Sequence, residues 1–392
     1  MNDWRLWIDT ARAPLETPAP APAPRRTLPS NWRWVVLFGF LVLGLGWLSL
    51  VLSRQPGSIA GVWYVNGLGI AWLAQTAPRQ WPLTLLAAAL GILGANLADG
   101  DPLLRAASFL PANLLEMTLG AAALRHRQLH TSDLRRPADL LALLVWGGLL
   151  PQLASAALGA MTVVAHGAAP HLDLALAWYQ GSVIGNLSVL PLAMLALRAR
   201  RDEAWSALRN PHLAWLAPLS LGVTLLCLGL VPFPFIYLSM PLLLAALLLD
   251  FLAVALLTLA VSLTVALAIA TGVFVPPPVT AQWQQVFVYL AYAAALFPAQ
   301  LLAAALADLR DSHARLAARS EALRRANEGL EQFVRIASHD LREPLNTVVQ
   351  FAALIEEDHG RGLPADARHW LGLVQAAATR MRVLLDDVLQ YT

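Results

Sequence analysis

Long apolar runs fill the sequence from residue 34 to residue 306, with short polar stretches between them. A helix that crosses a bilayer needs about 20 mainly apolar residues, and ten runs approach that length. The run 58–76 is the weakest, because its many glycines also suit a re-entrant segment. The pattern predicts an all-α polytopic membrane bundle of about eight to ten spans, at 34–53, 58–76, 81–98, 104–124, 138–164, 172–197, 212–231, 234–250, 251–275 and 284–306.

The arginines mark one side of this bundle. They precede the first run and follow the second, fourth and sixth, whereas the alternate loops lack them apart from Arg54 and Arg105 at helix ends. Basic residues concentrate in cytoplasmic loops, so ten spans place both termini in the cytoplasm and the chain in a bacterial inner membrane. Residues 1–33 contain a Pro-Ala tract, and we expect a disordered cytosolic tail there.

After residue 306 the pattern changes to a heptad. Four leucines recur at every seventh position, which is a coiled-coil seam: Leu309, Leu316, Leu323 and Leu330. The partner positions include His313, Ser320 and Asn327, and polar residues there weaken the coil. Residues 307–332 are therefore predicted to form a signalling linker whose alternative packings are close in energy.

Two amphipathic helices follow in residues 333–392. The break "EDHGRGLPAD" separates them, since Gly360, Gly362 and Pro364 end one helix and begin the next. A two-helix hairpin is too thin to bury its own apolar stripe, so two copies are expected to pair as a four-helix bundle. The sequence thus predicts a homodimer.

The first of these helices contains "RIASHDLREPLNTV", from Arg335 to Val348. This stretch resembles the phosphoacceptor box of histidine kinases, the HisKA domain, and the resemblance covers residues 330–392. It implies that His339 accepts a phosphoryl group, with Arg342 and Pro344 as further residues of the motif. A response-regulator receiver domain is the partner that the resemblance implies.

The residue types suit phosphoryl transfer. Asp340 can accept the Nδ1 proton of His339, which leaves the Nε2 lone pair to attack the γ-phosphoryl group of ATP. Pro344 removes the backbone hydrogen bond that would reach Asp340, and we expect it to bend the helix beside His339. Many relatives carry Thr or Asn four residues after the histidine for phosphatase activity, whereas this chain has Glu343. It is predicted to act mainly as a kinase or phosphoryl donor.

Polar side chains within the apolar runs are the candidate sensing residues. Glu116 and Asn113 share a helix face, and Asn96 and Asn186 lie in neighbouring runs. The carboxyl group of Glu116 suits a ligand or proton site or an interhelical hydrogen bond that holds the bundle together. Two small-residue spacings, one of them Gly181-x-x-x-Gly185, indicate close packing.

The motifs "VNGLGIAWLA", "GILGANLADG" and "WYQGSVIGNLSVLP" around these residues resemble the first class of membrane-associated sensor domains, MASE, across about residues 35–306. Many relatives carry an acidic residue where this chain has Ser182. If that carboxylate takes part in sensing, this member senses differently.

Composition narrows the function further. Of the residues, 58% are hydrophobic and 13% charged, and the net charge of +2 gives no reason to expect a nucleic-acid partner. The single cysteine allows no intrachain disulfide. Residues 1–392 contain no recognisable ATP-binding motif, so ATP and Mg²⁺ are expected to serve a catalytic domain downstream or in trans and not to bind this chain; a metal site is not expected either. A transporter with a regulatory tail, a membrane-bound phosphotransfer protein and a non-enzymatic scaffold remain alternatives.

Overall fold

The computed structural model describes residues 32–54, 60–166, 172–199, 201–276, 282–359 and 361–390. These residues are overwhelmingly helical, and no β-strand occurs among them, so the all-α prediction is confirmed. The chain divides into a first unit that ends at Leu309 and a second that begins at Arg310. Most of the predicted tail, residues 1–31, lies outside the described residues.

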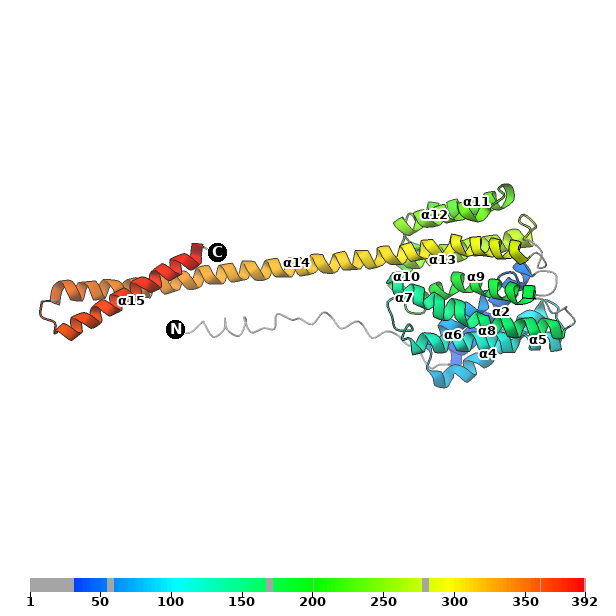
Figure 1. Cartoon of the computed structure of the whole chain (residues 1–392), viewed down its shortest axis with the longest axis horizontal. Coiled ribbons are helices and arrows are strands. Elements are labelled where there is room, and N and C mark those ends of the chain that lie inside the picture. Colours follow the sequence, from blue (N-terminus) through cyan, green and yellow to red (C-terminus); the bar gives the residue numbers. More distant parts are fainter. Residues whose placement is uncertain are drawn as a thin grey trace. The chain divides into compact units, whose positions relative to one another are not determined.

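The first unit contains helices at the positions of the predicted runs (Figure 1). In the described part of the chain, seven helical segments are long and apolar enough to cross a membrane. They are α2 (Trp32–Ser53), α4 (Trp81–Ala98, preceded by η1, Pro78–Gln80), α5 with α6 (Leu103–Ser108, Leu110–His126), α7 with the π-helical η2 and α8 (Pro137–Leu143, Leu144–Leu149, Leu150–Ala165), α11 (Leu213–Leu230), α13 (Phe251–Ala270) and the first part of α14 (Gln282–His359).

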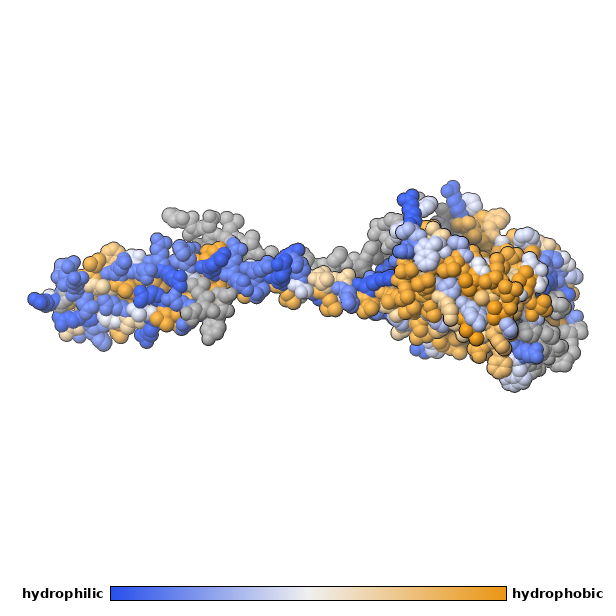
Figure 2. All heavy atoms as spheres, turned by 90° about the horizontal axis from the view of Figure 1, so that it is seen from above, coloured by the Kyte–Doolittle hydropathy of each residue, from blue (hydrophilic) through white to orange (hydrophobic). Residues whose placement is uncertain are grey.

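The remaining helices of this unit are shorter or less apolar. They are α3 (Val65–Gln75), α9 (Leu172–Ala196), α10 (Arg201–Leu208) and α12 (Pro234–Leu248). Large apolar side chains such as Phe40, Leu90 and Leu226 lie exposed on the outside of the unit, and Figure 2 shows a largely hydrophobic surface there. Apolar side chains suit contact with the hydrocarbon of a bilayer, because hydrocarbon offers no hydrogen bonds to polar groups. The chain is an integral membrane protein.

The second predicted span differs from a regular spanning helix. Helix α3 has 11 residues, a length of about 17 Å, whereas a bilayer core is about 30 Å thick. Every residue of α3 is buried, and so are residues 61–64 before it. Because Arg54 after α2 pairs with Asp99 after α4, both helices end on the same side, and the chain between them must cross back. It does so inside the bundle, where non-helical backbone is tolerated.

Glycines on α9 explain how this crossing packs. A Cβ added to Gly185 would lie 1.8 Å from the carbonyl oxygen of Trp63, and one added to Gly181 would lie 2.8 Å from that of Ala60. The backbone amide of Trp63 also donates to the carbonyl of Gly181 at 3.1 Å. The predicted close packing at this glycine spacing is therefore present, but its partner is the irregular backbone before α3 and not a second helix.

The second unit is a helical hairpin formed by the end of α14 and by α15 (Ala365–Gln390). Helix α14 has 78 residues and continues through the linker and the phosphoacceptor motif. The buried residues of the hairpin are small, with Ala352 on α14 and Ala378 on α15. Many of its large apolar side chains stay exposed in the single chain, among them Phe351, Trp370 and Leu384.

Candidate functional site

The phosphoacceptor motif lies on an exposed face of α14. The side chain of His339 is 80% exposed and that of Asp340 is 72% exposed. His339 Nδ1 lies 3.3 Å from Asp340 Oδ1, within hydrogen-bonding distance. In the tautomer with a proton on Nδ1, this contact would leave Nε2 free as the nucleophile. The neighbouring Ser338 faces inward and is 3% exposed.

Arg342 joins the two helices of the hairpin, because its Nη2 donates to Asp386 Oδ1 on α15. Glu343 remains exposed, and its backbone carbonyl accepts a hydrogen bond from Thr347 Oγ1 at 3.0 Å. Pro344 leaves the carbonyl of Asp340 without its usual helical donor. Helix α14 continues through Pro344 to His359, and the predicted bend stays a prediction.

An apolar groove of about 460 Å³ runs along the hairpin beside the motif. Its lining comes from both helices and contains no charged residue: Leu341, Pro344, Leu345 and Val348 of α14, and Met381, Leu384, Leu385 and Val388 of α15. All of them except Pro344 and Leu384 belong to the apolar stripe that the sequence predicts for the two helices. A single hairpin therefore leaves this stripe incompletely covered.

The membrane unit contains a second polar site, centred on Glu116 of α6, which is fully buried. Two residues of α9 donate to its carboxyl group, Asn186 Nδ2 to Oε1 at 3.1 Å and Ser182 Oγ to Oε2 at 3.3 Å. The side chains of Ser155 on α8 and Asn66 on α3 also lie near this carboxyl group, although Nδ2 of Asn66 has no hydrogen-bond partner among the described residues. Four helices thus meet at one acidic group, which fits the predicted interhelical role and leaves the ligand alternative open.

Two tryptophans donate hydrogen bonds to the residues that surround Glu116. Trp178 Nε1 donates to Ser155 Oγ at 3.1 Å, and Trp63 Nε1 donates to Asn66 Oδ1 at 3.2 Å. Both indoles border a cavity of about 40 Å³ beside the cluster, whose lining also includes Asn96, Asn113, Phe109 and Ser182. Ser182 therefore connects the cavity to Glu116.

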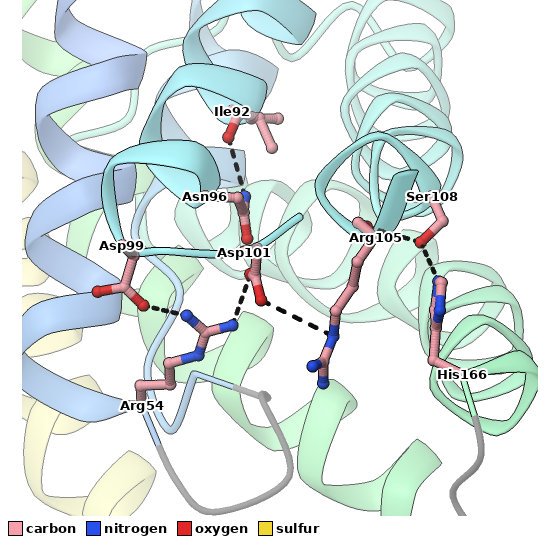
Figure 3. Close-up of polar contacts among 8 residues, drawn as sticks. All are labelled: Arg54, Ile92, Asn96, Asp99, Asp101, Arg105, Ser108 and His166. Carbon is pink, nitrogen blue, oxygen red and sulfur yellow. Dashed lines mark hydrogen bonds and ion pairs between the residues drawn. The ribbon is translucent and has the colours of Figure 1, made fainter. Parts of the chain in front are cut away.

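A charged cluster closes the same end of the bundle (Figure 3). Arg54 pairs with both Asp99 and Asp101, and Arg105 lies 3.8 Å from Asp101. The backbone amide of Asp101 donates to the carbonyl of Asn96 at 3.0 Å. Hydrogen bonds to the two carboxylates outweigh partial burial and raise the pKa of Arg54. The cluster fixes the ends of α2 and α4 beside the cavity.

The four residues named as candidates for sensing divide into two groups. Asn186 contacts Glu116 directly, whereas Asn96 and Asn113 line the cavity. The sequence does not predict a role for Ser155, because serine is an ordinary residue in membrane helices and no local spacing connects α8 with α6. Trp178 is the first residue of the motif "WYQGSVIGNLSVLP", but the motif does not indicate its contact with Ser155. Ser182, noted for the missing acidic group, donates to Glu116.

Comparisons with known proteins agree with these two parts of the chain. The MASE1 family model matches residues 32–310, and the model of the His Kinase A (phospho-acceptor) domain matches residues 329–392. Phytochrome-like protein Cph1 of Synechocystis sp. is 39% identical over 69 residues, 18% of this chain and 9% of that protein. Sensor protein DivL of Caulobacter vibrioides is 38% identical over 82 residues, 21% of this chain and 10% of that protein.

The membrane part has its own relative. Probable diguanylate cyclase DgcE of Escherichia coli is 25% identical over 214 residues, 54% of this chain and 19% of that protein. The chain thus spans less than a fifth of the length of each of these three relatives, and no solved structure matches it significantly. Since the MASE1 model covers most of the chain, the chain belongs to the MASE1 family, and its C-terminal hairpin carries a His Kinase A (phospho-acceptor) domain.

Proposed function

We propose that this protein works in a two-component system as a membrane sensor histidine kinase, with His339 as its phosphorylation site. The phosphoryl group comes from ATP, bound with Mg²⁺ by a catalytic domain downstream or on another chain, and passes to an aspartate of a response-regulator receiver domain. The single observation that carries the proposal is the exposed His339 beside Asp340 within the phospho-acceptor match.

The chemistry follows from these two side chains. Asp340 Oδ1 accepts the Nδ1 proton and holds the ring in one tautomer, while Nε2 attacks the γ-phosphorus and ADP leaves. The P–N bond then breaks when the receiver aspartate attacks the phosphorus. Arg342 acts in this scheme as a positioning residue, since its ion pair with Asp386 is on the neighbouring helix and not at the histidine. Glu343 stands where many relatives carry the Thr or Asn used for phosphatase activity. This supports a protein that mainly donates phosphoryl groups to the regulator and does not remove them.

The working form is a homodimer through the hairpin and the linker. The apolar groove of about 460 Å³ needs a second apolar surface to cover it, and the same apolar stripe on a second hairpin would supply one in a four-helix bundle. The four seam leucines support the same pairing, because each is more than half exposed in the single chain: Leu309, Leu316, Leu323 and Leu330.

The sensor is placed in the bacterial inner membrane with both termini in the cytoplasm. The arginine distribution supports this orientation, and it puts the hairpin in the compartment that contains ATP and response regulators. Both Arg54 and the Glu116 cavity then lie toward the opposite side of the bilayer, where a stimulus from outside the cell arrives.

The test compares two histidine replacements on the same helix. The protein is incubated with radiolabelled ATP and Mg²⁺ in a preparation that contains the catalytic domain, joined to this chain or added in trans. We expect acid-labile, alkali-stable label in the wild type and in His359→Gln, whose histidine is also exposed on α14, and none in His339→Gln. Label that persists in His339→Gln would contradict the proposal.

A further inference from the structure

The carboxyl group of Glu116 is buried without a compensating positive charge. Its hydrogen-bond donors are the neutral side chains of Ser182 and Asn186, and the neighbouring Asn66 and Ser155 are neutral as well. Within the described chain, no basic side chain forms an ion pair with Glu116. A buried ionisable group in a membrane normally faces a partner of opposite charge or a water-filled cavity. The charge that balances Glu116 must therefore come from a proton or from a bound cation.

The adjoining cavity presents oxygen acceptors. The amide nitrogens of Asn96 and Asn113 donate to the carbonyls of Ile92 and Phe109, one helical turn earlier. Their carbonyl oxygens are the ends that remain available. Asn113 is 2% exposed, and its Oδ1 has no hydrogen-bond partner among the described residues. An unpaired buried acceptor is costly, and a ligand that donates hydrogen bonds would satisfy it.

Size and aromatic walls narrow the class of ligand. A cavity of about 40 Å³ holds roughly three water molecules, whereas sites for drug-sized ligands measure about 300–1,000 Å³. Trp63, Trp178 and Phe109 form the walls, and indole and phenyl faces attract cations, most strongly where water is excluded. A small cation with N–H donors fits both the acceptors and the rings.

We propose that this cavity binds a small ammonium-type cation, either ammonium or a short primary amine. Its N–H groups donate to the amide oxygens of Asn96 and Asn113, and Glu116 balances its charge through Ser182. Arg54 and Arg105 do not compete for the site, because both are held by Asp101 at the end of the bundle (Figure 3).

The cavity is also connected to the helix that carries His339. Trp63 is followed by Tyr64, whose hydroxyl lies 3.1 Å from Ser262 Oγ on α13. Ser262 Oγ lies 2.8 Å from the hydroxyl of Tyr292 on α14. Binding that moves Trp63 would thus disturb hydrogen bonds to α14. The role of the cation as a stimulus, unlike its binding, rests on the proposed kinase function.

The test measures binding of radiolabelled methylammonium to the full chain in phosphatidylcholine nanodiscs at one fixed pH, without ATP. The wild type should bind it saturably, and unlabelled ammonium chloride should displace it. Glu116→Gln keeps the shape but removes the charge, and should weaken binding by at least about tenfold. Asp250→Asn is the control, because Asp250 is an exposed carboxylate at the start of α13 and should leave binding unchanged.

Asn113→Leu gives a second test if Glu116→Gln melts at a lower temperature. It replaces the amide with a somewhat larger apolar side chain of the same branching and should weaken binding several-fold. No saturable binding by the wild type, equal affinity in Glu116→Gln, or equal displacement by potassium chloride would each overturn the proposal. Potassium competition of that kind would assign the cavity to alkali ions. Since no phosphorylation is measured, these results are independent of the test on His339.

Discussion

Replacing Gly185 with alanine should destabilise the membrane unit by filling space that the backbone before α3 occupies. The added Cβ would lie 1.8 Å from the carbonyl oxygen of Trp63 and 2.4 Å from its carbonyl carbon. To bring the added Cβ to an ordinary van der Waals separation, the backbones of α9 and Trp63 must move apart by roughly 1.6 Å. The obstacle is backbone on both sides, so no side-chain rotation can relieve it.

The expected cost combines two effects. Forcing a methyl group into a packed interior costs about 1–3 kcal/mol, and moving Trp63 endangers its hydrogen bond to Gly181, worth about 1 kcal/mol. Alanine recovers at most about 1 kcal/mol through its better helix propensity. We therefore expect a net loss of about 1–3 kcal/mol, or roughly 2–12 °C in melting temperature.

The assay is thermal unfolding of the purified chain in one detergent, followed by tryptophan fluorescence. Gly44→Ala on α2 and Gly222→Ala on α11 are matched controls, because an added Cβ there meets nothing within 4 Å. Both should melt within a few degrees of the wild type. If Gly185→Ala melts with these controls, the close approach of α9 to the Trp63 backbone is refuted.

Three further predictions concern the hairpin, a loop and the connection to α14. The half-exposed Arg342–Asp386 pair should show a coupling below about 1 kcal/mol in a double-mutant cycle on unfolding, and a value above about 2 kcal/mol would contradict this. Burial and nearby arginines lower the pKa of His130 in the folded chain. The contribution of the neutral imidazole to folding stability is therefore present above pH ~6.5 and declines as the pH falls below that value. His130→Asn should flatten the melting-temperature profile below pH ~6.5, and an unchanged profile would exclude the effect. Tyr292→Phe removes a hydroxyl bonded to Ser262 and should reduce the effect of methylammonium on His339 labelling while methylammonium binding persists; full retention of that effect would count against the connection.

The hairpin site could be predicted from sequence because its determinants are local. His339 and Asp340 are consecutive residues, and the glycines and proline near residue 362 fix where the chain turns. The seam leucines repeat at a spacing that depends only on helix geometry. Asn113 and Glu116 were placed on one face of one helix by the same reasoning. Each of these predictions needs no knowledge of a distant segment.

The surroundings of Glu116 could not be predicted in the same way. Its partners lie on three other helices, and Ser155 is brought to it by packing that periodicity does not encode. Gly185 and Gly181 set part of that packing, but their partner is irregular backbone near Trp63, where the apolar pattern suggested a helix. Hydrophobicity alone cannot distinguish a lipid-facing helix from a buried, partly irregular crossing, since both are apolar throughout.

Within the described chain, helix α14 is the direct covalent path from the membrane bundle to His339, so its attachment to the bundle determines what the hairpin receives. Tyr292 Oη donates to the carbonyl of Ser262 at 3.1 Å, and Gln300 Nε2 donates to that of Leu187 on α9 at 2.9 Å. Each buried hydrogen bond contributes about 1 kcal/mol, and coupling energies between sites are typically about 1–3 kcal/mol. A change at one or two of these contacts is therefore large enough to transmit a signal. The polar seam positions beyond residue 309 are predicted to make the linker responsive to so small a change, because such residues keep alternative coiled-coil packings close in energy.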